Sequence, residues 1–177
     1  MKEDRVTWQE FQDRKLNSLQ EILERTESRI REGKPSDYNI DLDLLPILNA
    51  WNSIPFNYTF CSASGTMKEH RTHECRNGLG GEPHGFIWAH SFQNHPDFEK
   101  FNKLILRLEW FDSSSSKPDE NYNLGSKYET KNKGLYRYAL KIWVPQEEIN
   151  KSDFYLNKNW KDLKNKLIRF RQSLYKK

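Results

Sequence analysis

A chain of 177 residues is long enough for one domain with a real core, and nothing in its length calls for two. Its 29 Lys and Arg against 25 Asp and Glu make it weakly basic, and its two cysteines exclude a disulfide framework. No apolar run is long enough for a signal sequence or a membrane span, so we expect a cytoplasmic protein without a membrane partner.

Two helices are predicted at the start of the chain. Thr7 and Glu10 form a capping box, and apolar residues then recur at helical spacing until a glycine ends the pattern. This pattern predicts a helix over residues 7–32. A second helix is predicted over residues 43–52, with Asp43 as its N-cap.

A strand-like run that ends in small polar residues follows the second helix. Aromatic and β-branched residues favour a strand over residues 57–63. Ser62, Ser64 and Gly65 then offer hydroxyl groups, exposed amides and a free φ angle where that strand ends. We expect a binding site at this Ser-Gly turn, with residues 66–70 pairing back as a hairpin partner.

All five histidines of the chain lie between residues 70 and 95. The spacing of His70, His73, Cys75 and His84 is short enough for one loop to wrap a zinc ion. A single cysteine among loop histidines matches no standard structural zinc spacing, however. We therefore expect no metal. The interpretation that competes with metal binding, and that we favour, is that these polar side chains line a pocket.

The second half of the chain alternates apolar and polar residues in three places. Strands are predicted over residues 86–91, 104–111 and 135–144, with a brief helix near residues 97–103. Residues 112–134 are rich in Ser, Lys, Asn and Gly without periodicity, which predicts a long flexible excursion.

The C-terminal segment, residues 153–177, is a basic amphipathic helix, predicted to run over residues 153–175. Its basic face is either a solvated surface or a set of RNA phosphate contacts. The residues proposed for such contacts are Lys161, Lys164, Arg169 and Arg171. Taken as one domain over residues 1–177, the elements predict an α+β fold with a mixed, largely antiparallel sheet of about five strands, flanked by three main helices.

An ordered set of short motifs resembles a known family over residues 11–111. That family opens with Phe-x-x-Arg-Lys, has an acidic position before a leucine-rich helix, and carries a signature similar to Asn-Ser-Leu-Pro-x-Tyr-Tyr-Thr-Thr-Ser-Ser-Cys-Ser-Gly-Arg. Later strands end in Ser-His and in Leu-Lys-x-Glu-Pro-Phe. The matching residues are Phe11, Arg14, Lys15, Asp41, Asn52, Ser53, Pro55, Thr59, Ser62, Ser64, Gly65, Ala89-His90 and Leu106 to Phe111. The chain resembles a divergent member of the tRNA wybutosine-synthesising methyltransferases, which N-methylate a tricyclic base in phenylalanine tRNA.

The resemblance implies an S-adenosylmethionine-dependent N-methyltransferase that acts on a modified tRNA base. It implies catalytic roles for His90 and Ser62, with His90 accepting the proton released after attack. It also implies a pocket in which His90 converges with Ser62, Ser64 and Gly65. It also implies a set of substrate or cofactor contacts, namely Thr59, Ser62, Ser64, Gly65, Asp41 and Glu109.

Among the departures from the signature, Ala63 stands for the Cys, and Thr66 stands for the Arg, which removes a fixed charge. An alternative is therefore a relative without activity that serves as an RNA- or ligand-binding module. A third is a metal-binding protein.

Overall fold

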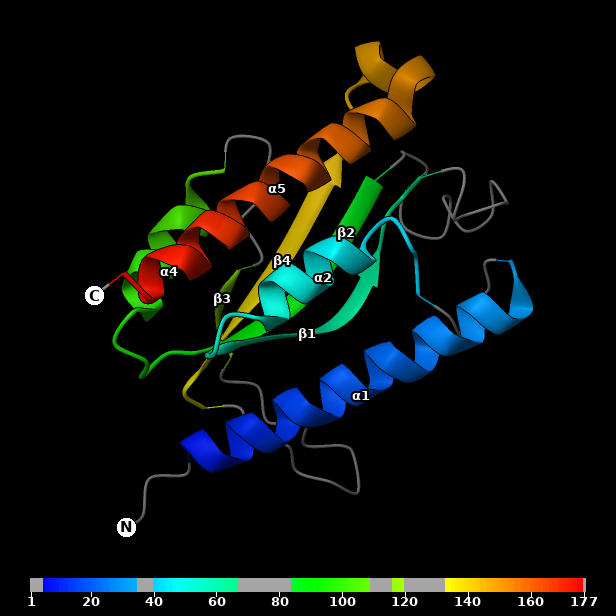
Figure 1. Cartoon of the computed structure of the whole chain (residues 1–177). Coiled ribbons are helices and arrows are strands. Elements are labelled where there is room, and N and C mark those ends of the chain that lie inside the picture. Colours follow the sequence, from blue (N-terminus) through cyan, green and yellow to red (C-terminus); the bar gives the residue numbers. More distant parts are fainter. Residues whose placement is uncertain (1–4, 35–39, 67–83, 109–115, 120–132, 177) are drawn as a thin grey trace.

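The computed structural model describes residues 5–34, 40–66, 84–108, 116–119 and 133–176 (Figure 1). Its α-helices are α1 (Trp8–Glu32), α2 (Leu45–Asn52), α4 (Phe98–Leu106) and α5 (Ser152–Leu174), with a 3-10 helix η1 (Gln146–Lys151) before α5. Its strands are β1 (Asn57–Ala63), β2 (His84–Phe92), β3 (Lys117–Asp119) and β4 (Leu135–Trp143). The fold is α+β, as predicted. In the part of the chain described, no helix is long and apolar enough to cross a bilayer.

The strands form one sheet in the order β1-β2-β4-β3, and every neighbouring pair is antiparallel. In the centre of the sheet, Trp88 of β2 pairs with Ala139 of β4. On the other side of β2, Tyr58 pairs with His90, and a β-bulge lies between Thr59 and Cys61 of β1. The bulge shifts the alternation of side chains along β1, which decides where the polar residues of this strand point.

Helices α2, α4 and α5 cover one face of the sheet, and α1 runs along its β1 edge (Figure 1). Ile87, Leu140 and Ile142 are fully buried beneath the helices. The Tyr138 ring contacts Trp51 of α2 and Phe101 of α4 at centroid distances of 5.6 and 5.8 Å. The core is therefore aromatic and aliphatic, and it lies between the sheet and the helices.

The predicted helices are confirmed, but one predicted cap is wrong. Thr7 and Glu10 form the capping box of α1, and Gly33 ends that helix with φ +66°. Leu44, and not Asp43, is the N-cap of α2, and its side chain makes no capping hydrogen bond. The Asp43 carboxylate accepts a hydrogen bond from Thr66 instead.

The strand predicted over residues 104–111 is wrong over its first part, because residues 104–106 form the last turn of α4. Phe98, Phe101 and Ile105 are buried at helical spacing, and this stripe prevails over the local alternation. Within the predicted excursion 112–134, β3 pairs with β4. Most of the predicted strand 66–70, residues 109–111 and the remaining part of the excursion lie outside the described residues.

Candidate functional site

The Ser-Gly turn after β1 is buried and closed by its own polar groups. Ser64 and Thr66 have no exposed surface. The Ser64 N–H donates to Oδ2 of Asp41 at 2.5 Å, and the Thr66 hydroxyl donates to Oδ2 of Asp43 at 3.0 Å. The hydroxyl oxygens of Ser64 and Thr66 lie 3.1 Å apart. These side chains satisfy one another, and therefore Asp41 and Ser64 act here as structural groups.

The backbone of this turn also packs closely against α5 and the start of β2. Nε1–H of Trp160 in α5 donates to the Ser64 carbonyl at 3.0 Å. Gly65 has φ +75°, and a Cβ there would lie 2.2 Å from the His84 carbonyl oxygen. A Cβ on Gly85 would lie 2.4 Å from the Ser64 carbonyl oxygen. Glycine is therefore required by close backbone approach, and the turn leaves no room for a ligand.

A second polar network joins α2 to β1. Nδ2 of Asn52 donates to the Leu48 carbonyl at 2.8 Å and to Oγ1 of Thr59 at 2.9 Å. Oδ1 of Asn52 accepts from the Thr59 N–H at 3.0 Å. The Thr59 carbonyl in turn accepts a hydrogen bond from Ser18 of α1. Thr59, a predicted substrate contact, thus fixes three elements to one another.

Lys15 fastens α1 to the loop between α2 and β1. Its Nζ donates to the carbonyls of Ile54 at 2.5 Å and Pro55 at 3.2 Å. Burial of the ammonium group lowers the pKa of Lys15 from 10.5 to about 8. One turn earlier, the fully buried Phe11 packs on Tyr58 with its ring centroid 5.3 Å away.

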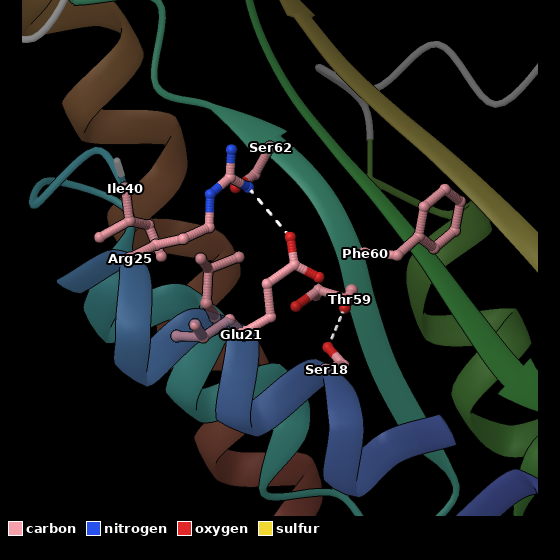
Figure 2. A pocket seen from close by; sticks show the side chains of 9 residues that line it. Ser18, Glu21, Arg25, Ile40, Thr59, Phe60 and Ser62 are labelled. Carbon is pink, nitrogen blue, oxygen red and sulfur yellow. Dashed lines mark hydrogen bonds and ion pairs between the residues drawn. The ribbon is translucent and has the colours of Figure 1, made fainter. Parts of the chain in front are cut away.

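A narrow, partly polar cleft lies between α1 and β1 (Figure 2). It is lined by Ser18, Glu21, Ile22, Arg25, Ile40, Leu48, Thr59, Phe60 and Ser62. The Arg25 guanidinium lies 3.6 Å from the Glu21 carboxylate, and both side chains are more than a third exposed. The cleft encloses about 20 Å³, which is room for one water-sized group. Ser62 is thus the predicted turn residue that reaches an opening.

His90 lies apart from Ser62 and the turn, so the predicted convergence of these residues is wrong. Ser62 pairs with Ile87, three residues from His90 along β2, or about 10 Å. Nδ1 of His90 lies 3.0 Å from the Tyr58 hydroxyl, and its ring stacks under Phe60 at 4.7 Å. The buried His90 therefore belongs to the sheet face that points away from α2 and α5.

The remaining predicted site residues are scattered. Glu109, His70, His73 and Cys75 lie outside the described residues. The His84 ring packs on Trp143 at 4.6 Å, and no group of three metal-ligating side chains occurs among the residues that the structure describes. On α5, Lys161, Arg169 and Arg171 are exposed and Lys164 is half-buried. Helix α5, which carries these cations, lies in the layer on one face of the sheet (Figure 1), and His90 lies on the other face.

A row of aromatic side chains that was not predicted from the sequence lies on the sheet face away from α2 and α5. Successive centroids lie 4.6, 6.5, 5.9, 6.2 and 4.7 Å apart along a path that crosses β4, β2 and β1. This aromatic ladder consists of Trp143, His84, Phe86, Trp88, Phe60 and His90. The signal was present in the alternation of His84, Phe86, Trp88 and His90 with small or aliphatic residues along β2.

Comparisons with known proteins add little to this geometry. No family model matches the chain, and no curated protein matches it. A solved structure, that of the PH1069 protein from Pyrococcus horikoshii, is 15% identical in sequence, and the match covers 93% of this chain and 97% of that chain. The TM-score of 0.38 is too low to support an argument about fold or function.

Proposed function

We propose that the protein is an S-adenosylmethionine-dependent N-methyltransferase that acts on a modified tRNA base of the wybutosine type. The supporting observation is that residues matching the family motifs gather around β1, although they are spread over more than fifty positions of the sequence. The contacts join Lys15 to Ile54 and Pro55, Asn52 to Thr59, and Asp41 to Ser64. If the short motif matches had arisen by chance, we would not expect the matching residues to contact one another around one strand.

Most of these residues are scaffold, so the chemistry of the proposal belongs to the cleft beside them. The zwitterionic amino-acid end of the donor fits the charges available there, with its carboxylate at Arg25 and its ammonium at Glu21. The hydroxyl of Ser62 is a further polar contact. The match is one of charge alone, because the 20 Å³ that the cleft encloses hold one water-sized group and are too small for the amino-acid end or the adenosine part of the donor.

S-adenosylmethionine supplies an electrophilic methyl group, and the contribution of the protein is to hold the donor and the acceptor nitrogen in line. Such a transfer needs little acid–base chemistry from the protein. The proposal assigns no proton transfer to His90, because its ring faces away from the cleft and is bonded to Tyr58.

Calorimetry with S-adenosylmethionine tests this proposal. The wild-type protein should bind the donor, and Arg25→Gln should weaken binding about tenfold, the worth of one charge-assisted hydrogen bond. Arg31→Gln is the matched control, since Arg31 is an exposed arginine in the last turn of the same helix. Equal losses in both variants would contradict a donor site in the cleft.

The second candidate is a relative that has lost donor binding and binds RNA alone. The observation that favours it is the place of Thr66, which stands where the family signature has Arg. Its side chain is fully buried on Asp43 and offers no charge to a donor carboxylate or a phosphate. No heat of binding at millimolar donor, together with retained tRNA affinity, would select this candidate over the first.

A further inference from the structure

The aromatic ladder lies on the sheet face away from α2 and α5, and α1 covers the end of that face at Tyr58 and Phe92. Trp88 and Phe60 are 40% and 37% exposed, whereas large aromatic side chains in this protein are otherwise mostly inside. The sequences of β1, β2 and β4 contain no acidic residue. Several adjoining aromatic rings at the surface form a larger apolar patch than a sheet normally exposes to solvent. Such a patch indicates a contact surface.

Positive charge adjoins these rings. Beside Trp88 is a hollow of about 180 Å³ lined by Arg137, Ala139 and Lys141. Ala139 pairs with Trp88, so its small side chain leaves the space open, and the two cations lie on either side of it along β4. Nζ of Lys141 lies 5.9 Å from the centroid of the Trp143 ring. Rings and cations thus alternate over the strands.

We propose that this face binds single-stranded RNA, with unpaired bases stacked on Trp88 and Phe60 and backbone phosphates at Arg137 and Lys141. Stacking accepts any base and the cations accept the phosphates, which is how sheet surfaces bind single strands. The face carries positive charge and no acidic residue of these three strands, so it suits a polyanion such as a nucleic-acid backbone. The choice of RNA over DNA rests on the proposed function, whereas the surface itself rests on the geometry.

Fluorescence anisotropy with a labelled ten-nucleotide oligouridylate tests the proposal, with the full chain, at low salt and without donor. Trp88→Ala should weaken binding about 5- to 150-fold, since one stacked base contributes about 1–3 kcal/mol. Phe60→Ala should act in the same direction. Trp8→Ala is the matched control, because Trp8 is 42% exposed but lies on α1, and its affinity should stay at the wild-type value.

The charge arm of the experiment uses Arg137→Gln with Lys141→Gln. This double variant should weaken binding. It should also reduce the magnitude of the slope of log K for binding against log salt concentration by about 1.4, because each of the two lost phosphate contacts on a single strand contributes about 0.7. Thermal melting confirms that each variant is folded. Unchanged affinity in Trp88→Ala and Phe60→Ala would overturn the proposal. So would tighter binding of duplex RNA than of the oligouridylate, or binding of a DNA oligonucleotide without binding of the oligouridylate. Because no donor is present, the result is independent of the calorimetry with Arg25→Gln.

Discussion

The two faces of β2 differ in a way that is the reverse of an ordinary sheet. Towards the helices this strand presents Gly85, Ile87, Ala89 and Ser91, all buried. Towards the other side it presents two histidines, Phe86, the 40% exposed Trp88 and the buried Phe92, which packs on α1. The larger apolar groups therefore lie on the less covered side. The covered face of β2 serves packing, and the open face keeps surface free for a partner.

The same contrast applies to polar groups. On the helix side, Asn52, Thr59, Asp41 and Ser64 bond to one another, so their loss should lower stability. On the open side, Arg137 and Lys141 line a hollow, so their loss should lower affinity and spare the fold. Substitutions on the two sides test this difference.

Gly65→Ala should have the largest effect on stability. Its Cβ would meet the His84 carbonyl at 2.2 Å with φ at +75°, so the turn must move or unfold, at a cost of about 4 kcal/mol or more. Gly33→Ala is the control, because Gly33 has φ +66° but nothing within 4 Å of the added Cβ, and it should cost about 1–2 kcal/mol. Urea unfolding measures both. Similar losses in the two variants would show that the close approach at Gly65 is unimportant.

Asn52→Ala should cost about 2–3 kcal/mol, because it leaves the N–H and hydroxyl of Thr59 buried without their partner. The exposed Asn49 on the same helix provides the control, and Asn49→Ala should stay within about 0.5 kcal/mol. Chemical denaturation at neutral pH checks both values. A loss below about 1 kcal/mol in Asn52→Ala would argue against a structural role for this network.

Lys15 should make stability depend on alkaline pH. Its pKa is about 8 when folded and 10.5 when unfolded, so between these values the unfolded state binds more protons. The free energy of unfolding should therefore rise as pH increases from about 8 to 10.5, by about 2 kcal/mol. Lys15→Met should remove this rise. Unfolding curves of both proteins from pH 7 to 10.5 give the difference, and parallel curves would exclude Lys15 as the titrating group.

The basic face of α5 should matter least for binding a single strand. Lys164→Glu with Arg171→Glu should weaken oligouridylate binding by less than about threefold at 0.15 M salt, because charges on the far side of the molecule are screened. Arg137→Glu with Lys141→Glu should weaken it far more. The reverse order would move the RNA surface from the sheet to α5.

Local sequence signals predicted the helices well, because the residues within and at the ends of each helix indicate where it runs. The capping box and Gly33 define both ends of α1, and the apolar stripe defines α5. The error over residues 104–106 arose because a short apolar run satisfies both periods, and only burial of Ile105 beneath the sheet favours the helix. Long-range packing decided this element.

The site was predicted in part. Ser62 and His90 were grouped because both resemble positions of one family site. Regular alternation from Tyr58, which pairs with His90, would put Ser62 on the same face as His90. The bulge after Thr59 reverses the alternation, so Ser62 turns to the helix side. The burial of Ser64 also depends on Trp160, which is 96 positions away in sequence. Neither effect has a local signature.

The most direct test of the central claim is the response of the tryptophan indole N–H signals in an NMR titration with oligouridylate. The claim predicts that the Trp88 and Trp143 signals shift, because both rings belong to the aromatic ladder. The Trp160 signal, bonded to the Ser64 carbonyl, and that of the fully buried Trp51 should stay in place. Shifts at Trp160 and Trp51 with none at Trp88 would contradict the division of the sheet into a structural face and a binding face.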